Sequence, residues 1–265
     1  MKYAATFLAL LMFGLTSLSN AAEQIVFRDK QGRVLTEADL SSLSGDVKWE
    51  IRGNKSVPQE ASKLHELGRI AGQKGDSKKA IEYFEKASAA APDWPYPLYD
   101  SAFTYLLGEQ YSKAYQLYQR VDKMAPRGYF TTKTAVHTLE RESRGDLPKG
   151  TYLRYVSLEW VNDESQKRQF VAALTERIPN FAPGWKERAQ FEDDPQLRLS
   201  ALNKGLAARP DEETKGYLLV NKAIVLHQQG KREDAVSILG TLALDPHAPV
   251  DVELMAKKTL ANMLR

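Results

Sequence analysis

Histidine is the side chain that most often transfers protons or binds metal ions near neutral pH. The sequence has four histidines, which are His65, His137, His227 and His247. No two of them form a His-x-x-x-His pair, and Glu66 beside His65 does not belong to a His-Glu-x-x-His zinc motif. We therefore interpret all four as ordinary helix or loop residues, with a role in binding as the alternative for His65 and His227.

The other residue patterns that carry out chemistry are also missing from the sequence. It has no Gly-x-Ser-x-Gly elbow for a nucleophilic serine and no glycine-rich loop of the kinds that hold phosphates. It has no cysteine, which removes thiol catalysis, cysteine-bound metal ions and disulfide bonds. The acidic runs 192–194 and 211–213 adjoin prolines, and we interpret them as negative charge near helix N-termini. A carboxylate pair or metal site is the alternative for the first run. We expect no catalytic residue, no cofactor and no metal ion.

The first two dozen residues have the pattern of a secretory signal peptide. Lys2 is followed by the apolar run 4–18, and Ser19 and Ala21 are small residues spaced for cleavage. A transmembrane helix needs about 20 consecutive apolar residues, and this run is shorter. We expect cleavage after Ala21, or after Ala22, and an exported protein. The periplasm of a Gram-negative bacterium is the preferred compartment, and secretion from the cell is the alternative.

The rest of the chain is nearly balanced in charge. The formal net charge is +3 for the whole sequence. No long basic run is present, so we expect no nucleic-acid partner. No later segment is apolar for long enough to span a bilayer, and we expect no stable membrane span after cleavage.

A pattern of small and aromatic residues recurs along the chain. Its first copy is Gly68, Ala80, Phe84, Ala87 and Pro92, its second is Ala102, Ala114, Tyr118, Val121 and Pro126, and a third is Ala223, Ala235, Leu239, Leu242 and Pro246. The spacing predicts units of two helices joined by a tight turn. Small residues allow the two helices to approach closely, the larger ones fill the space between units, and proline prevents the second helix from continuing.

These residues, together with Leu64 and Leu67, resemble the signature of the tetratricopeptide repeat, whose period is about 34 residues. Ala71 departs from it, because the family usually has an aromatic residue there. The resemblance implies an all-α fold, a right-handed α-solenoid of helix pairs. It also implies that the first helices of successive repeats line a concave face, which such proteins use to bind extended peptides or partner helices.

We expect the chain to be organised in six parts. They are a signal peptide (1–21), a small N-terminal strand or hairpin element (22–57), two well-matched repeats (58–128), an extra helix that ends near Gly145 (129–147), degenerate repeats (148–247) and a C-terminal capping helix (248–265). In the N-terminal element, 25–27, 33–35 and 47–51 are predicted strands and 36–43 a predicted helix.

The candidate partner-binding residues all fall on predicted first helices. They are His65, Arg69, Gln73, Tyr96, Tyr99, Phe103, Tyr217, Asn221 and His227. Those of the first repeat are expected to be exposed, whereas packing between helices is the alternative for the aromatic side chains Tyr99 and Phe103. Some relatives clamp a C-terminal carboxylate with Lys and Asn. His65 and Arg69 take those positions here, so we do not expect that role.

The sequence thus predicts a non-catalytic scaffold or adaptor of the cell envelope. It would bind a peptide or a partner protein on the concave face of the solenoid. The alternative is a module that binds a small molecule or a glycan with aromatic side chains such as Tyr99. No sequence motif supports an enzyme.

Overall fold

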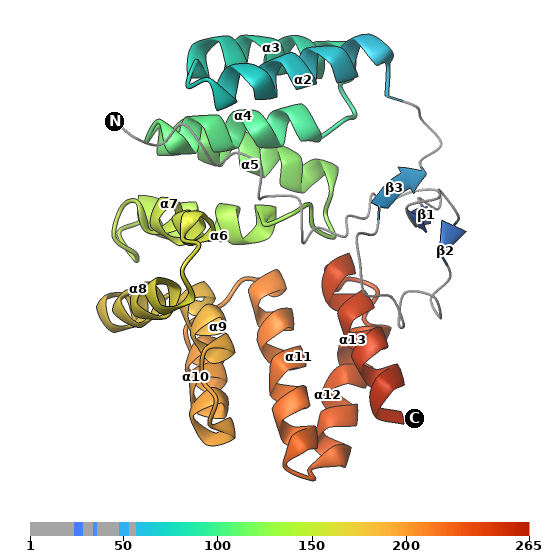
Figure 1. The fold of residues 1–265 in the computed structure, drawn as a ribbon, viewed down its shortest axis with the longest axis vertical. Helices are drawn as coiled ribbons and strands as arrows, with labels where there is room; N and C mark the ends of the chain where they lie inside the picture. Colours follow the sequence, from blue (N-terminus) through green and yellow to red (C-terminus); the bar gives the residue numbers. More distant parts are fainter. Residues whose placement is uncertain (1–23, 29–33, 36–47, 53–56, 265) are drawn as a thin grey trace.

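A computed structural model describes residues 24–28, 34–35, 48–52 and 57–264, and these residues are mostly helical (Figure 1). The N-terminal helices lie across the long axis one above another, whereas the C-terminal helices run roughly along it and lie next to one another, and a small sheet lies beside the helices. This confirms the predicted fold class, an α-solenoid with a small β-containing element. The predicted signal peptide and the helix predicted at 36–43 lie outside the described residues.

The sheet has three short strands, β1 (Gln24–Arg28), β2 (Val34–Leu35) and β3 (Lys48–Arg52). β1 is central and pairs antiparallel with both neighbours, so that Phe27 lies opposite Leu35 on one side and Trp49 on the other. The strands coincide with the segments where apolar residues alternate or cluster in the sequence.

The two well-matched repeats form the first four helices that the structure describes. They are α2 (Gln59–Gln73), α3 (Ser77–Ala90), α4 (Tyr96–Leu107) and α5 (Tyr111–Met124). Gly75 lies in the turn between α2 and α3 and has a φ of 79°, a backbone conformation that favours glycine. Asp76 then caps α3 by accepting a 3.0 Å hydrogen bond from the backbone N–H of Lys79.

The repeated small and aromatic residues pack as the spacing predicts. A Cβ added at Gly68 in α2 would lie 2.5 Å from Cε1 of Phe84 in α3, so the helices meet where a side chain would not fit. Ala80 and Ala87 flank Phe84 on the buried side of α3. In the second repeat, the buried residues of α5 are Ala114, Tyr118 and Val121.

The middle of the chain is less regular. It contains α6 (Thr132–Ser143), α7 (Thr151–Val156), the 3₁₀ helix η1 (Ser157–Trp160), α8 (Glu164–Arg177), α9 (Ala182–Gln190) and α10 (Pro195–Ala207). α6 coincides with the expected extra helix. Glu142 of α6 accepts hydrogen bonds from the backbone N–H groups of Gly150 (2.8 Å) and Tyr152 (2.7 Å), and so caps the short helix α7.

The last helices are α11 (Glu212–Gln228), α12 (Arg232–Leu244) and α13 (Val250–Leu264). α13 coincides with the expected capping helix, and its residues Val252 and Ala256 are fully buried. Among the described residues, no helix is both long enough and apolar enough to cross a membrane.

Residues from 209 onward contact α6 and the loop before it, at separations of 72 to 126 residues in the sequence. Thr134 of α6 donates to the carboxylate of Asp211 (3.2 Å), and a ring nitrogen of His137 bonds the carbonyl of Arg209 (2.9 Å). In the loop before α6, Arg127 donates to the carbonyl of Ala248 (2.9 Å) and pairs with Glu253 of α13. These contacts join the C-terminal repeat to the middle of the chain.

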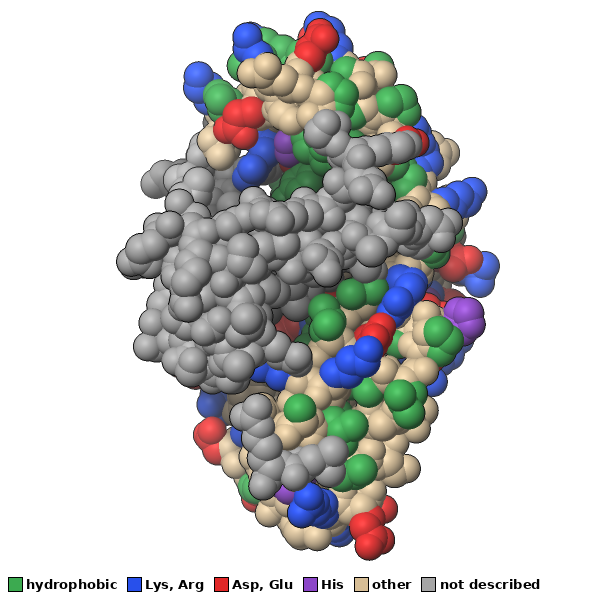
Figure 2. Space-filling model, turned by 90° about the vertical axis from the view of Figure 1, so that its right-hand side faces the viewer, with side chains coloured by type: hydrophobic (Ala, Val, Ile, Leu, Met, Phe, Trp, Pro, Cys, Tyr) green, Lys and Arg blue, Asp and Glu red, His purple; other side chains and the backbone are tan. Residues whose placement is uncertain are grey.

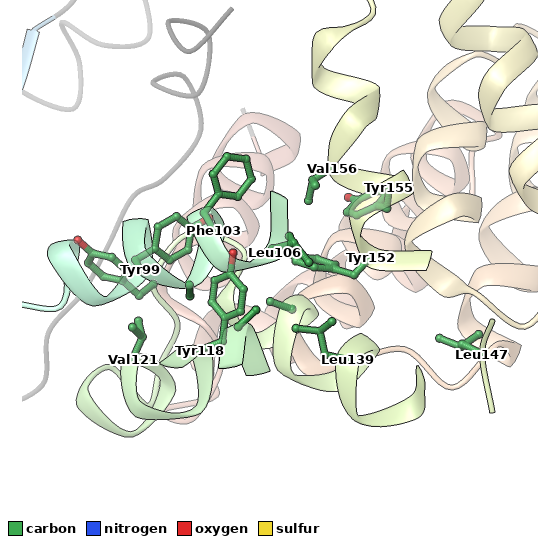
Figure 3. Close-up of a cluster of buried hydrophobic side chains, with 14 of the residues drawn as sticks. Tyr99, Phe103, Leu106, Tyr118, Val121, Leu139, Leu147, Tyr152, Tyr155 and Val156 are labelled. Atoms are coloured by element: carbon green, nitrogen blue, oxygen red, sulfur yellow. The ribbon is translucent and has the colours of Figure 1, made fainter. Parts of the chain in front are cut away.

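An aromatic core links the second repeat to α6 and α7. Figure 3 shows Tyr99, Tyr118 and Tyr152 among aliphatic side chains from α4, α5 and α6. The ring of Tyr118 meets those of Tyr99 (5.6 Å between centroids) and Tyr152 (6.1 Å) edge to face, a favourable arrangement. Figure 2 shows one outer face of the molecule, where the described acidic and basic side chains are interspersed.

Candidate functional site

The predicted binding residues lie on what we call the first-helix face, the side formed by α2, α4, α9 and α11. The structure separates those of the N-terminal half from those of the C-terminal half. We describe the two halves in turn.

His65 of α2 is buried, with 7% of its surface exposed. Its Nε2 lies 2.8 Å from the carboxylate of Asp100 in α4, and its ring meets those of Trp94 and Tyr96 edge to face. The expectation that His65 is exposed was wrong, because α4 packs across it and supplies the acidic partner. Arg69 and Gln73, one and two turns further along α2, are partly exposed.

Tyr99 and Phe103 are buried, with 6% and 8% of their surfaces exposed. The hydroxyl of Tyr99 is hydrogen-bonded to Thr131 (3.2 Å), and burial raises the pKa of its phenol. The packing alternative is therefore right for both residues. Their spacing placed them on the first-helix side of α4, but the aromatic core covers that side. Tyr96 is partly exposed, and its ring lies 5.3 Å from that of Phe130.

In the C-terminal half, Tyr217 and Asn221 lie one turn apart on α11 and are partly exposed. Tyr217 donates its hydroxyl proton to the carboxylate of Asp251 in α13. Asn221 donates to the backbone carbonyl of Tyr217 (2.8 Å). His227 is also partly exposed, two turns nearer the end of α11.

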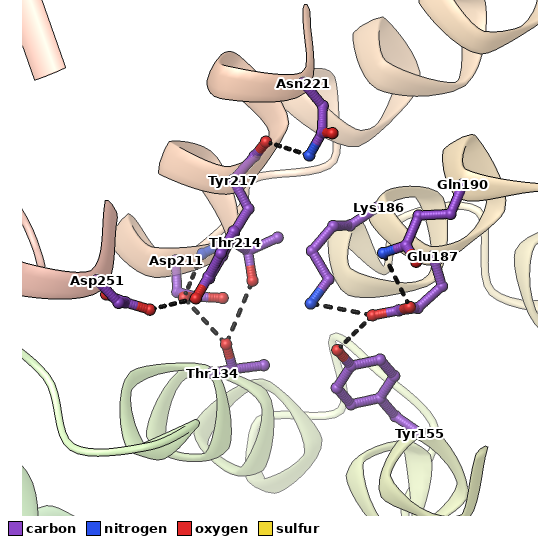
Figure 4. A network of polar contacts seen from close by, with 10 residues as sticks. All are labelled: Thr134, Tyr155, Lys186, Glu187, Gln190, Asp211, Thr214, Tyr217, Asn221 and Asp251. Atoms are coloured by element: carbon purple, nitrogen blue, oxygen red, sulfur yellow. Dashed lines mark hydrogen bonds and ion pairs between the residues drawn. The ribbon is translucent and has the colours of Figure 1, made fainter. Parts of the chain in front are cut away.

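Tyr217 belongs to a group that we call the inner polar cluster, drawn in part in Figure 4. Its members are Tyr155 of α7, Lys186 and Glu187 of α9, Glu213 and Tyr217 of α11, and Asp251 of α13. The cluster therefore draws on four helices that are far apart in the sequence. All of its members except the buried Tyr155 and Glu213 are partly exposed.

Lys186 is the cation of the inner polar cluster. Its Nζ lies 3.0 Å from Glu187 and above the rings of Tyr217 (5.2 Å) and Tyr155 (5.8 Å). Tyr155 also donates to Glu187 (3.0 Å). Burial alone would lower the pKa of Lys186, but the charge of Glu187 and the neighbouring Tyr155 raise it well above its usual range. The ammonium group is therefore held in its charged form.

Glu213 is the least satisfied member of the inner polar cluster. It is 5% exposed, and its Oε2 is buried with no hydrogen-bond partner among the described residues. Burial, followed by the charges of Asp251 and Asp211, raises the pKa of Glu213 well above its usual range. Burial also raises the pKa of Asp251, while the bond from Tyr217 opposes this shift. The charge of Asp251 thus disfavours a charge on Glu213.

Most of the inner polar cluster was not predicted from the sequence. The acidic run 211–213 was interpreted as charge at a helix N-terminus, and Asp211 does cap α11 by accepting from the N–H of Thr214 (3.0 Å). Asp194 caps α10 in the same way. Glu213 and Tyr217, however, are four residues apart and therefore lie on the same side of α11. This spacing is visible in the sequence. Among the described residues, no group of three or more His, Cys, Asp or Glu is arranged to hold a metal ion.

Comparison with known protein families supports the assignment of the first repeat. Residues 64–93, which lie in α2, α3 and the turn after them, match the family model of the tetratricopeptide repeat. The chain therefore contains a tetratricopeptide repeat. The match coincides with the first of the repeats that the sequence predicted. A search of curated proteins found no match.

Several solved structures resemble this chain at low sequence identity. MamA from residue 41 onward, from Desulfovibrio magneticus RS-1, is 13% identical, with 70% of this chain and 94% of MamA covered and a TM-score of 0.34. YrrB, described as having an unusual peptide-binding site, is 14% identical, with 75% and 92% covered and a TM-score of 0.32. The TPR2AB domain of yeast Sti1, solved with pHSP90, is 12% identical, with 77% and 98% covered and a TM-score of 0.35. Sequence identities and TM-scores this low do not indicate a shared function.

Proposed function

We propose that this protein is a non-catalytic scaffold or adaptor that binds a peptide or a partner protein on its first-helix face. The observation that carries the proposal is the inner polar cluster. It gathers polar and aromatic side chains from four helices, most of them partly exposed, and it leaves the buried Oε2 of Glu213 without a hydrogen-bond partner among the described residues.

The fixed geometry of the cluster favours recognition. Tyr217 is held by Asp251, Asn221 by the backbone of α11, and Lys186 by Glu187. Side chains that are already held in place lose little conformational freedom when a partner binds, so more of the interaction energy contributes to affinity. Tyrosine is also among the residues that most often anchor protein interfaces.

The protonation states in the cluster favour binding over catalysis. A lysine nucleophile needs a lowered pKa, whereas that of Lys186 is raised. A tyrosine that acts as a base must lose its proton near neutral pH, whereas burial raises the pKa of Tyr155 and of Tyr217. These pKa shifts argue against Lys186 as a nucleophile and against Tyr155 and Tyr217 as bases.

A glycan-binding module was the alternative prediction from the sequence. It depended on aromatic rings that are open to a stacked sugar, such as that of Tyr99. Tyr99 and Phe103 are buried and not accessible to a sugar, which leaves only Tyr96 and Tyr217 of the predicted aromatic residues partly exposed. We therefore favour a protein or peptide partner.

We further propose that binding takes place in the cell envelope, with the Gram-negative periplasm preferred over secretion. The support is the signal-like pattern of residues 1–21. The chain contains no cysteine, so its stability does not depend on disulfide formation in that compartment.

Affinity capture from the native envelope, followed by mass spectrometry, tests the proposed function. The bait is compared with a first-helix-face variant, Gln73→Arg with Asn221→Arg, and with a control variant, Gln116→Arg with Ser200→Arg. All four positions carry neutral polar residues, and the control positions are exposed on the second helices α5 and α10. We expect the first variant to lose the captured partner and the control to retain it. Equal capture by both would refute the use of the first-helix face.

A further inference from the structure

The inner polar cluster contains more acidic than basic side chains. Its carboxyl groups are those of Glu187, Glu213 and Asp251, and its one cation is Lys186. The ammonium group of Lys186 is already engaged by Glu187 at 3.0 Å. The charge of Lys186 acts on both Glu213 and Asp251, but among the described residues neither carboxyl group forms an ion pair with a cation.

Lys133 also acts on Glu213, but it does not form an ion pair with it. Lys133 of α6 contributes to the electrostatic environment of Glu213 less than Lys186 does. Its ammonium group lies 3.3 Å from Asp122 and 3.5 Å from Glu212, so it is engaged by two other carboxylates. Oδ1 of Asp211 caps α11 and accepts a hydrogen bond from Thr134, whereas its Oδ2 is buried without a partner among the described residues.

The position of Glu213 is unusual for a carboxylate. Burying a charged or polar group without a partner is costly, and the great majority of buried polar groups have one. Oε2 of Glu213 is buried and has no partner among the described residues. Asp251 accepts one hydrogen bond from Tyr217 and one from the backbone N–H of Val252 (2.9 Å). Glu213 is thus an acceptor that the described part of the protein leaves open.

The aromatic side chains beside these carboxyl groups favour a cation. Tyr217 and Tyr155 already carry the ammonium group of Lys186 above their rings. The negative faces of such rings attract ammonium and guanidinium groups. Tyr217 and Asp251 remain partly exposed, which leaves the edge of the cluster open to an incoming side chain.

We propose that Glu213 and Asp251 bind a cationic side chain of the partner, an ammonium or guanidinium group, so that the partner presents a basic residue to the inner polar cluster. This inference rests on the proposed function. The incoming group would donate to Oε2 of Glu213 and lie between two carboxyl groups and the ring of Tyr217. A carboxylate-bearing partner would meet repulsion at the same place.

A titration with small probes tests the inference on the full mature chain. The probes are the N-acetyl methylamides of lysine, arginine and norleucine, the last being a neutral counterpart of lysine. Nuclear magnetic resonance follows the backbone amide signals of Tyr217 and Val252. We expect saturable shifts with the lysine or the arginine probe, and which of the two binds tighter identifies the preferred cation. Norleucine should bind at least tenfold more weakly. Absence of saturable shifts with both cations, or equal binding of norleucine, would overturn the proposal.

Two variants and one control connect the binding to the proposed residues. Glu213→Gln and Asp251→Asn should each weaken binding of the cationic probes at least tenfold. Glu212→Gln, an exposed neighbour on the same helix, should leave binding unchanged. Glu213→Gln removes a buried charge, so it should melt no lower than the wild type at pH 7.5, and lost binding then does not reflect unfolding. Binding that is unchanged in both variants would overturn the proposal.

The two proposals can fail separately. If the probes do not bind but the Gln73→Arg, Asn221→Arg variant still loses its captured partner, only the cationic recognition is wrong. If the probes bind at Glu213 but capture does not depend on the first-helix face, the site for a cation is right and the proposed mode of partner binding is wrong.

Discussion

Glycine to alanine substitutions at two helical positions should have opposite effects on stability. Gly68 lies in α2 and Gly240 in α12. In a helix interior, alanine is favoured over glycine by about 1 kcal/mol. A Cβ added at Gly240 meets nothing within 4 Å, so Gly240→Ala should gain most of that amount.

Gly68→Ala should instead destabilise the protein. The added Cβ would lie 2.5 Å from Cε1 and 2.6 Å from Cδ1 of Phe84, whereas carbon atoms in contact are usually about 3.5–4.0 Å apart. The ring must therefore move by about 1 Å, yet it is 1% exposed and packs near the ring of His65. Overpacking typically costs about 1–3 kcal/mol. Because the helical gain of about 1 kcal/mol offsets part of this cost, we expect a net loss of up to about 2 kcal/mol.

Thermal melts followed by circular dichroism would measure both effects. For a protein of this size, 1 kcal/mol corresponds to about 2–4 °C in Tm. Gly68→Ala should therefore lower Tm by up to about 8 °C, and Gly240→Ala should raise it by about 2–4 °C. Because repeat proteins can open locally, hydrogen exchange should also speed up in α2 and α3 of the first variant.

A second substitution tests the proposed cause. Phe84→Leu, introduced together with Gly68→Ala, replaces the rigid ring by a smaller side chain and should cost less than the sum of the two single changes. The reasoning would be refuted if Gly68→Ala were as stabilising as Gly240→Ala. It would also be refuted if the two substitutions at positions 68 and 84 were simply additive.

Three further predictions concern other parts of the chain. Burial raises the pKa values of Glu213 and Asp251 above their ordinary values, so these groups bind protons more tightly in the folded state than in the unfolded state. The contribution of the two protonated groups to the free energy of unfolding is therefore complete below about pH 4. It is lost as the pH rises through the folded pKa values. Tm measured across this range should therefore fall with rising pH, less so in Glu213→Gln, and an equal fall in both proteins would contradict the prediction. Arg127→Ala removes the bond to Ala248 and the pair with Glu253, and should cost about 1–2 kcal/mol and speed hydrogen exchange in α13, whereas Arg232→Ala, at an exposed position, should not. N-terminal sequencing of exported material should find Ala22 or Glu23 first, and a membrane-embedded form that retains Met1 would refute the cleaved signal.

The helix pairs could be predicted from the sequence because the contacts within a repeat are local. Gly68 and Phe84 are 16 residues apart, and the turn at Gly75 and Asp76 brings them together without help from the rest of the chain. The same holds for Ala114 and Tyr118, which repeat the spacing. The helical order and the capping helix 250–264 follow from the same local patterns of small, apolar and turn residues.

The burial of the predicted anchors depends on contacts between repeats, which the sequence pattern does not encode. Tyr99 lies on the expected side of α4, but Thr131 and Tyr129 in the loop before α6 cover it. His65 is likewise buried because α4 of the next repeat packs across it and places Asp100 within hydrogen-bond distance of its ring. A periodic pattern identifies the side of a helix, but whether that side is open depends on which neighbouring segment packs against it.

By itself, the sequence determined the repeat, its helix boundaries and the lack of any catalytic motif, because each of these depends on residues within about one repeat. Only the tertiary structure decided which polar groups meet. Tyr155, Lys186, Glu213 and Asp251 span nearly a hundred residues, and their meeting depends on how α7, α9, α11 and α13 are placed relative to one another. Small rotations between successive helix pairs accumulate along a solenoid, so the position of each helix relative to a distant one is set by the sum of many packing contacts and by no single pattern of residues.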